Sequence, residues 1–471
     1  MNLLYLLSNV LLAAFSLVLA HRIGRGRSKT GNLLFSVEYG IWVYVFLIIL
    51  VFMSLGALPA LVGFDDARLL RRGIVASVFA AGSAAGLFLL RTSAGGLASD
   101  ARAAWSSLRR LLGNRLAVLS LILLALLLGT GLSKVIRYAP HVNDALAYHL
   151  EPVVRWHQQG WMPVTISYGG NPHFENVNRT FLGGSLLNLW AFWFFNNIVI
   201  IALPAVIFSV ALCLALYRLL RFLSLRPPHA LFFTAVIMST PAVMVHMDAC
   251  KNYTAYIYPW LSLTFLLAES VRDMESRKIL MGAFPFAVAW SSKIVATFVL
   301  PVTVGVFLAA HLAVHGIRDI RRDAGAMLRF AAVCIVLTVS TSWFWVYRNY
   351  VNDGTYFLRI KEQSWAFSIS GKNNDIENAP LEDRFAGIPL AKNIRILLGN
   401  VTAYPFRTQD PAVREDTYEV DATDASNFGL VYYSFGHVFL LLYAVFFAWR
   451  RFRSRRRAAL LFIALSAVVL L

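Results

Sequence analysis

Apolar residues along this chain come in continuous runs, and the runs recur from one end to the other. A helical run of about 20 apolar residues can cross the hydrocarbon core of a bilayer. A membrane β-barrel would instead show alternating apolar and polar positions. The pattern therefore predicts an all-α integral membrane protein with eleven or twelve spans. We expect them near residues 2–21, 36–63, 74–90, 116–133, 198–217, 231–247, 255–271, 279–295, 297–314, 330–347 and 428–449, followed by a shorter apolar run at 458–471.

Basic residues divide unevenly between the two sets of connecting segments. If the N-terminus lies outside, the inner segments hold 25 of the 43 Lys and Arg residues and only 6 acidic ones, counting Glu269 at a span end. Such an excess marks the cytoplasmic side of membrane proteins. It explains the net charge of +18 without nucleic acid as a partner. We expect the first span to be a retained anchor, because it lacks a basic leader and an A-x-A cleavage site.

Two outer segments are far longer than connectors need to be. They run from 134 to 197 and from 348 to 427, and both contain Trp, Tyr, Pro and paired charges rather than low-complexity sequence. Loops beyond about 12–15 residues usually carry function when they fold. No Walker pattern accompanies them, which argues against an ATP-driven pump. We therefore expect the chemistry of the protein on its extracytoplasmic face.

The first long outer segment contains a candidate site. Asp144 opens a stretch with helical apolar spacing, which predicts a short interfacial helix that reaches Trp156. Tyr148 is four residues after Asp144 and His149 is just over a turn away, so these side chains could share a pocket. Helix capping is the alternative role for Asp144. Glu175 is a second acid in this segment, and alone it could be a solvated surface carboxylate.

A further acid, Asp248, stands at the turn between two short predicted spans. Polar residues often mark span ends, so its position could reflect topology alone. Paired with Asp144 on the same face, it gains another interpretation. Two carboxylates could share a divalent ion such as Mg²⁺ or Mn²⁺, or bind an acceptor hydroxyl and remove its proton.

Two cations complete the candidate site. Lys293 lies within an apolar stretch, where a lysine costs roughly 2.5–3.5 kcal/mol at mid-membrane unless it is paired or hydrated. It either extends to the interface or binds an anion such as a phosphate at headgroup level. Arg348, at the end of a later span, could bind the same anion or serve as an interface anchor.

These motifs, in their order and spacing, resemble those of the GT-C superfamily of membrane glycosyltransferases, which includes protein mannosyltransferases and the aminoarabinose transferase of lipid A. The resemblance covers roughly 116–449 and leaves 1–115 as a three-span N-terminal extension and 450–471 as a basic stop with a partial last span. It rests on an Asp early in the first outer loop, a YH pair, a later Pro and acid, an Asp after the next span pair, the lysine in GAFPFAVAWSSKIVATFVLP, and the RN pair that leads to the second loop.

The resemblance implies a polyprenyl-phosphate-linked sugar as donor and an inverting transfer to a lipid, glycan or protein acceptor. Asp144 would be the general base or a metal-binding acid, and Asp248 its partner. Lys293 or Arg348 would bind the donor phosphate. The chain lacks the WWDYG motif of oligosaccharyltransferases, and Ala145 stands where protein mannosyltransferases have Glu. These departures argue against a protein acceptor.

Two other functions fit parts of the pattern. A transporter or flippase for a lipid-linked or polar substrate would also place charges within spans, although such proteins tend to show repeated halves. A non-catalytic subunit would make both aspartates dispensable. The composition of the chain, rich in Arg, Ala and Leu, suggests a bacterial inner membrane, with the site facing the periplasm.

Overall fold

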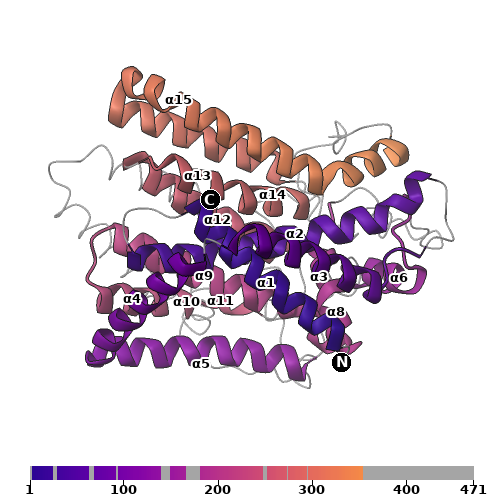
Figure 1. Ribbon diagram of the computed structural model, residues 1–471, viewed down its shortest axis with the longest axis horizontal. Helices are drawn as coiled ribbons and strands as arrows, with labels where there is room; N and C mark the ends of the chain where they lie inside the picture. Colours follow the sequence, from indigo (N-terminus) through magenta and orange to yellow (C-terminus); the bar gives the residue numbers. More distant parts are fainter. Residues whose placement is uncertain are drawn as a thin grey trace, which may run out of the picture.

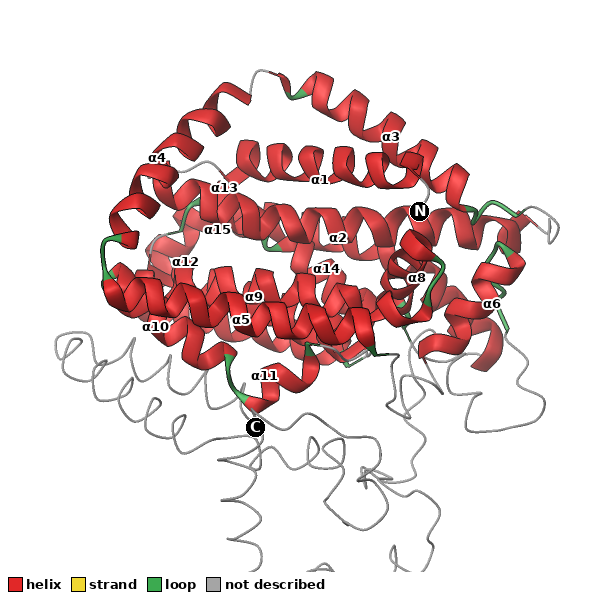
Figure 2. Cartoon of the chain, turned by 90° about the horizontal axis from the view of Figure 1, so that it is seen from below, coloured by secondary structure: helices red, strands yellow, loops and turns green. Residues whose placement is uncertain are grey.

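The computed structural model describes residues 3–24, 29–62, 68–91, 94–138, 149–165, 181–247, 252–272, 274–293 and 295–353. All regular elements in these ranges are helical (Figures 1 and 2). The elements are α1 (Leu3–Gly24), α2 (Lys29–Val62), α3 (Arg72–Leu89), α4 (Ala94–Leu112), α5 (Arg115–Arg137), α6 (Glu151–Gln159), α8 (Gly183–Phe195), the 3-10 helix η4 (Ile198–Ala202), α9 (Leu203–Phe222), α10 (Pro227–Met238), α11 (Pro241–His246), α12 (Asn252–Arg272), α13 (Ser276–Met281), α14 (Ala283–Ser292) and α15 (Ala296–Asp353).

Long apolar helices confirm that the chain is an integral membrane protein. Within the described residues, seven helices are long and apolar enough to cross a bilayer: Leu3–Gly24, Leu33–Val62, Arg72–Leu89, Arg115–Arg137, Ile198–Phe222, Val299–Gly316 and Asp323–Asn352. The expected spans at 428–449 and 458–471 lie outside the described residues. The count of eleven or twelve is therefore confirmed only in part.

The three remaining expected spans correspond to shorter or interrupted helices. The segment 231–247 divides into α10 and α11, because Pro241 starts a new helix and the side chain of Thr240 caps it. The segment 279–295 divides into α13 and α14, which meet at Gly282. The segment 255–271 forms α12, which contains Pro259. Breaks of this kind free backbone groups that neighbouring helices can satisfy.

Two stretches that the apolar pattern assigned to loops are helical. The first is α4, whose exposed face carries Arg102, Trp105, Arg109 and Arg110. The second is α8, whose sequence GGSLLNLWAFWFF is almost wholly buried. In addition, the two spans expected at 297–314 and 330–347 are joined into α15, which turns at Gly316, where φ is +77°. Figure 1 shows α15 folding back on itself at this turn.

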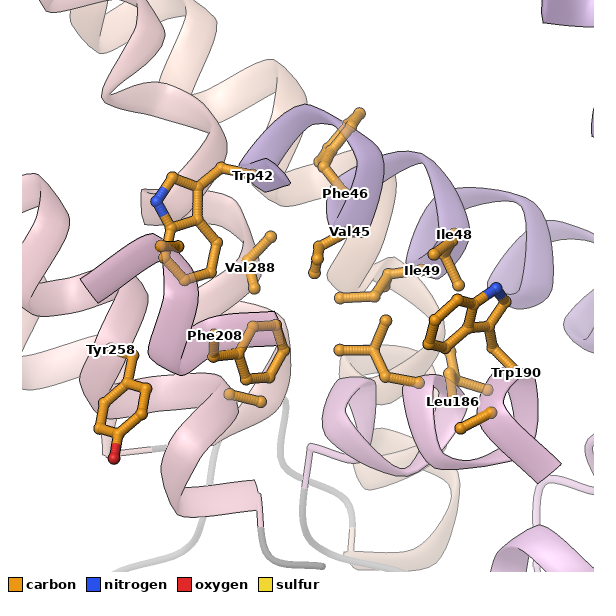
Figure 3. Close-up of a cluster of buried hydrophobic side chains, with 14 of the residues drawn as sticks. Trp42, Val45, Phe46, Ile48, Ile49, Leu186, Trp190, Phe208, Tyr258 and Val288 are labelled. Carbon is orange, nitrogen blue, oxygen red and sulfur yellow. The ribbon is translucent and has the colours of Figure 1, made fainter. Parts of the chain in front are cut away.

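The helices pack around α2, which contacts α1, α8, α9 and α14. The buried cluster in Figure 3 joins Trp42 and Phe46 of α2 to Trp190 of α8, Phe208 of α9 and Val288 of α14. The indole of Trp42 stacks on Phe208, with 5.6 Å between ring centroids. The first spans thus share one core with the later ones. Whether 1–115 is an extension to a family core stays a prediction.

The two ends of the bundle carry different short helices. One end has the N-terminus, α6 and α8, and the other has α4, as both views show (Figures 1 and 2). We call them the α6 end and the α4 end. The charge pattern predicts that the α6 end is extracytoplasmic and the α4 end cytoplasmic.

A buried ion cluster lies at the α4 end. The guanidinium of Arg218 on α9 donates from Nε and Nη2 to the carboxylate of Glu38 on α2, at 2.9 and 3.2 Å. It also forms an ion pair with Glu269 on α12. The guanidinium carbon lies 5.6 Å from the ring centroid of Phe35 and 5.7 Å from that of Tyr39. We call Glu38, Arg218 and Glu269 the Arg218 cluster.

Candidate functional site

The candidate site at the α6 end starts from α6 itself. Pro152 stands in its first turn, and an ion pair of Glu151 with Arg155, four residues on, supports the short helix at 2.7 Å. Gly160 ends it with φ +77°, a left-handed conformation that favours glycine. At this end of α6 the backbone is joined to the segment before α3, since Leu70 N donates to Gly160 O at 2.7 Å. This hydrogen bond anchors the C-terminal end of α6.

Two sides of α6 contact different neighbours. Trp156 stacks on Trp345 of α15, with 6.1 Å between ring centroids. The next residue, His157, accepts a hydrogen bond at Nδ1 from Trp193 Nε1 of α8, at 3.0 Å. Successive helical side chains point about 100° apart, so α6 forms a wall between α15 and α8. The sequence predicted a short helix from Asp144 to Trp156; the described helix, α6, starts at Glu151 and continues to Gln159, and neither tryptophan was named as a site residue.

The last two turns of α15 bring buried polar side chains to the other side of that wall. Arg348 is 0% exposed, and its guanidinium carbon lies 4.9 Å from the ring centroid of Trp345. Asn349 is 1% exposed, and within the described residues neither its oxygen nor its nitrogen has a hydrogen-bond partner. The indole nitrogens of Trp156 and Trp345 also lack one there. We call these four residues the Arg348 cluster.

One turn farther along α15, a polar contact ties the helix to the segment after α6. Asn352 Nδ2 donates to Val164 O at 3.0 Å, and Thr165 Oγ1 donates to Asn352 Oδ1 at 2.5 Å. Unsatisfied buried polar groups are uncommon in folded proteins, and each costs about 1–3 kcal/mol. Asn352 is therefore satisfied by described residues, whereas Asn349 is not.

The structure places three of the seven expected site residues. His149 is half-buried in the π turn that leads into α6. Lys293 is half-buried at the break that follows α14, where its backbone is extended (φ −152°, ψ 134°) and not helical. Arg348 belongs to the cluster described above. The other four lie outside the described residues: Asp144, Tyr148, Glu175 and Asp248.

The break at Lys293 adjoins α8. A Cβ on Gly183, in the first turn of α8, would lie 2.7 Å from Ser291 Oγ and 2.8 Å from Ser291 O. Only glycine allows the two helices to come this close just before Lys293. Because α8 also contacts α6 through the Trp193–His157 hydrogen bond, α8 connects the Lys293 break to the wall of the Arg348 cluster.

A small hollow opens on the α8 side of α6. It has a volume of about 260 Å³ and is lined by Leu70, Arg71, Arg72, His157 and Trp193. Burial, together with the nearby charge of Arg72, lowers the pKa of His157. The hydrogen bond from Trp193 requires an unprotonated Nδ1, so the imidazole here is neutral.

Metal binding at this end stays a prediction. The described residues contain no group of three or more His, Cys, Asp and Glu side chains that could hold an ion. Asp144 and Asp248, the expected ligands of Mg²⁺ or Mn²⁺, lie outside those residues.

Comparison with models of known protein families, with curated proteins and with solved structures finds no match for this chain.

Proposed function

We propose that this protein is a membrane glycosyltransferase that moves a sugar from a polyprenyl-phosphate donor to a lipid or glycan acceptor on the extracytoplasmic face. The observation that supports it best is the Arg348 cluster. It combines a buried arginine, the adjacent carboxamide of Asn349, which has no hydrogen-bond partner among the described residues, and two indole N–H donors. Arginine and amide donors suit a phosphate group, and the aromatic rings suit a sugar or a polyprenyl chain.

The reaction needs few groups. The acceptor oxygen attacks the anomeric carbon, the bond from that carbon to the phosphate oxygen breaks, and the polyprenyl phosphate leaves with the electron pair. Positive charge at Arg348, with Lys293 as the second candidate, stabilises the developing phosphate charge. Asp144 takes the hydroxyl proton as general base. Because the leaving phosphate is already a stable anion, no general acid is required.

The described neighbours of the two aspartates support their pairing. Asp144 follows the end of α5 by seven residues in the sequence, and Asp248 directly follows Met247. A Cβ on Gly131, in the last two turns of α5, would lie 3.2 Å from Met247 Cβ. The described chain ends that precede the two acids, the last turns of α5 and Met247, therefore lie next to each other.

The test is sugar transfer by membranes that contain the full chain. The donors are polyprenyl phosphates that carry labelled hexoses or pentoses, and the readout is label in lipid and glycan fractions. We expect transfer by the wild type, and its loss in Asp144→Asn with unchanged expression and membrane insertion. Arg348→Lys, which keeps the charge but loses the planar donor fork, should retain a reduced rate.

Two outcomes would contradict the proposal. The first is unchanged transfer by Asp144→Asn, which would remove the catalytic role of Asp144. The second is movement of the intact labelled donor across the membrane without sugar transfer, measured by its accessibility from each side of sealed vesicles. That result would support the transporter instead.

A further inference from the structure

A larger hollow lies at the opposite end of the bundle, away from every group in the proposed reaction. Its volume is about 680 Å³, and it opens between α1, α3 and α13. The lining residues are Leu19, Arg22, Ile23, Leu89, Leu90 and Arg277. This volume falls in the range of small-molecule sites.

Two arginines, Arg22 and Arg277, line this hollow. Within the described residues, neither Arg22 nor Arg277 forms an ion pair or hydrogen bond with another side chain. Neighbouring cations are paired: Lys278 contacts Glu275 at 2.7 Å, and Arg218 belongs to the ion cluster. Two like charges on one hollow repel each other, so an anion between them would be stabilised.

The apolar part of the lining extends toward lipid. Leu89 is 73% exposed and Phe88, beside it, is 64% exposed, both at the end of a membrane-spanning helix. Arg91 follows them, with its guanidinium carbon 4.7 Å from the ring centroid of Phe88. A lining that combines leucines with guanidinium groups matches a molecule with acyl chains and an anionic headgroup.

The adjacent helix α4 indicates that this hollow lies at a membrane surface. Its side chains Arg102, Trp105, Arg109 and Arg110 are exposed, and the Arg109 guanidinium carbon lies 5.3 Å from the Trp105 ring centroid. Exposed tryptophan and arginine on an amphipathic helix are typical of the interface between headgroups and acyl chains. Asp100 of α4 lies close to α1, with its Oδ2 3.9 Å from His21 Nε2.

We propose that this hollow is a binding site for one anionic phospholipid of the leaflet at the α4 end, with Arg22 and Arg277 holding the phosphate headgroup and the leucines contacting the acyl chains. Basic pockets between membrane helices on the cytoplasmic side are suited to such headgroups. The site is separate from the Arg348 cluster and does not depend on the proposed reaction.

The experiment is native mass spectrometry of the full chain, released from nanodiscs that contain phosphatidylglycerol and phosphatidylcholine. We expect one retained phosphatidylglycerol with a preference of roughly tenfold or more, since each basic residue near an anionic lipid contributes about fivefold. The double variant Arg22→Gln/Arg277→Gln should lose this preference. A control pair with the same change of charge, Arg226→Gln/Arg329→Gln, should keep it, because both are exposed arginines away from the hollow.

A second variant covers the case in which the double substitution disturbs folding. Leu89→Glu changes an exposed side chain at the mouth of the hollow, so it should fold normally and repel the headgroup. Equal retention of phosphatidylglycerol by Leu89→Glu and wild type would overturn the proposal. So would displacement of the lipid by free glycerol phosphate at the same concentration, because the hollow would then bind a soluble anion.

Discussion

The Arg218 cluster and the Arg348 cluster both bury an arginine, but they differ in what surrounds it. Arg218 is enclosed by the carboxylates of Glu38 and Glu269, which balance its charge. Arg348 lies over the ring of Trp345, and the next residue of the helix, Asn349, has two polar atoms with no partner among the described residues. The first arrangement holds three helices together. The second is the arrangement on which the proposed phosphate site rests.

The largest expected effect on stability comes from opening the Arg218 cluster. Arg218→Gln would leave the buried carboxylate of Glu38 and the half-buried one of Glu269 without their cation, and breaking a buried pair costs about 3–5 kcal/mol. We expect a large drop in the thermal unfolding midpoint of the detergent-solubilised protein. A matched variant, Arg221→Gln on the exposed side of α9, should change little. A drop of similar size in both variants would show that the ion pairs of Arg218 contribute no more to stability than an exposed arginine does.

The opposite result is expected at the Arg348 cluster. Asn349→Leu removes two unsatisfied polar atoms and replaces them with an apolar side chain, so stability should stay unchanged or rise by about 1 kcal/mol. Sugar transfer should be lost, because the variant removes a donor to the substrate phosphate. The unfolding midpoint and the transfer rate are measured on the same preparation. A clear loss of stability would mean that Asn349 has a structural partner.

The smallest expected effect concerns His157. Its pKa is lowered in the folded state, so the neutral form is favoured and stability falls as the pH drops below about 6.5, the usual value for histidine. His157→Asn keeps an acceptor near the position of Nδ1 and does not titrate. Between pH 7.5 and 5.5, the unfolding midpoint of the wild type should therefore fall more than that of the variant. If the unfolding midpoints of wild type and variant fall equally with pH, protonation of His157 does not lower the stability.

The sequence predicted the fold class well because continuous apolar runs have few alternatives in a membrane. It predicted helices less well where they are apolar but too short to span a membrane, or long but too polar. The helix α8 lies within the segment 134–197 that was expected to be an outer loop; its thirteen residues are too few for a span, yet they are almost wholly buried. The helix α4 lies within the inner segment 91–115; its mean polarity is high, although its apolar side chains follow a helical period.

The candidate site was predictable only in part. Arg348 was named because a charge at the end of a span is visible in the sequence. Asn349 and Trp345 were not, since a buried asparagine and a core tryptophan look like ordinary residues until their partners are known. A usable signal was present: Trp345, Arg348 and Asn349 are spaced three and four residues apart, so they share one helical face. The contact with Trp156, almost 190 residues away in the sequence, required the structure.

The most direct test of the account is equilibrium binding of a polyprenyl monophosphate to the full chain in detergent. Hydrogen bonds to a charged group contribute about 1.5–3 kcal/mol, so Asn349→Leu and Arg348→Gln should each weaken binding by about tenfold or more. Arg226→Gln, at the other end of the bundle, should bind as the wild type does. Equal affinity of all four proteins would show that the phosphate binds elsewhere and would contradict the assignment of the Arg348 cluster.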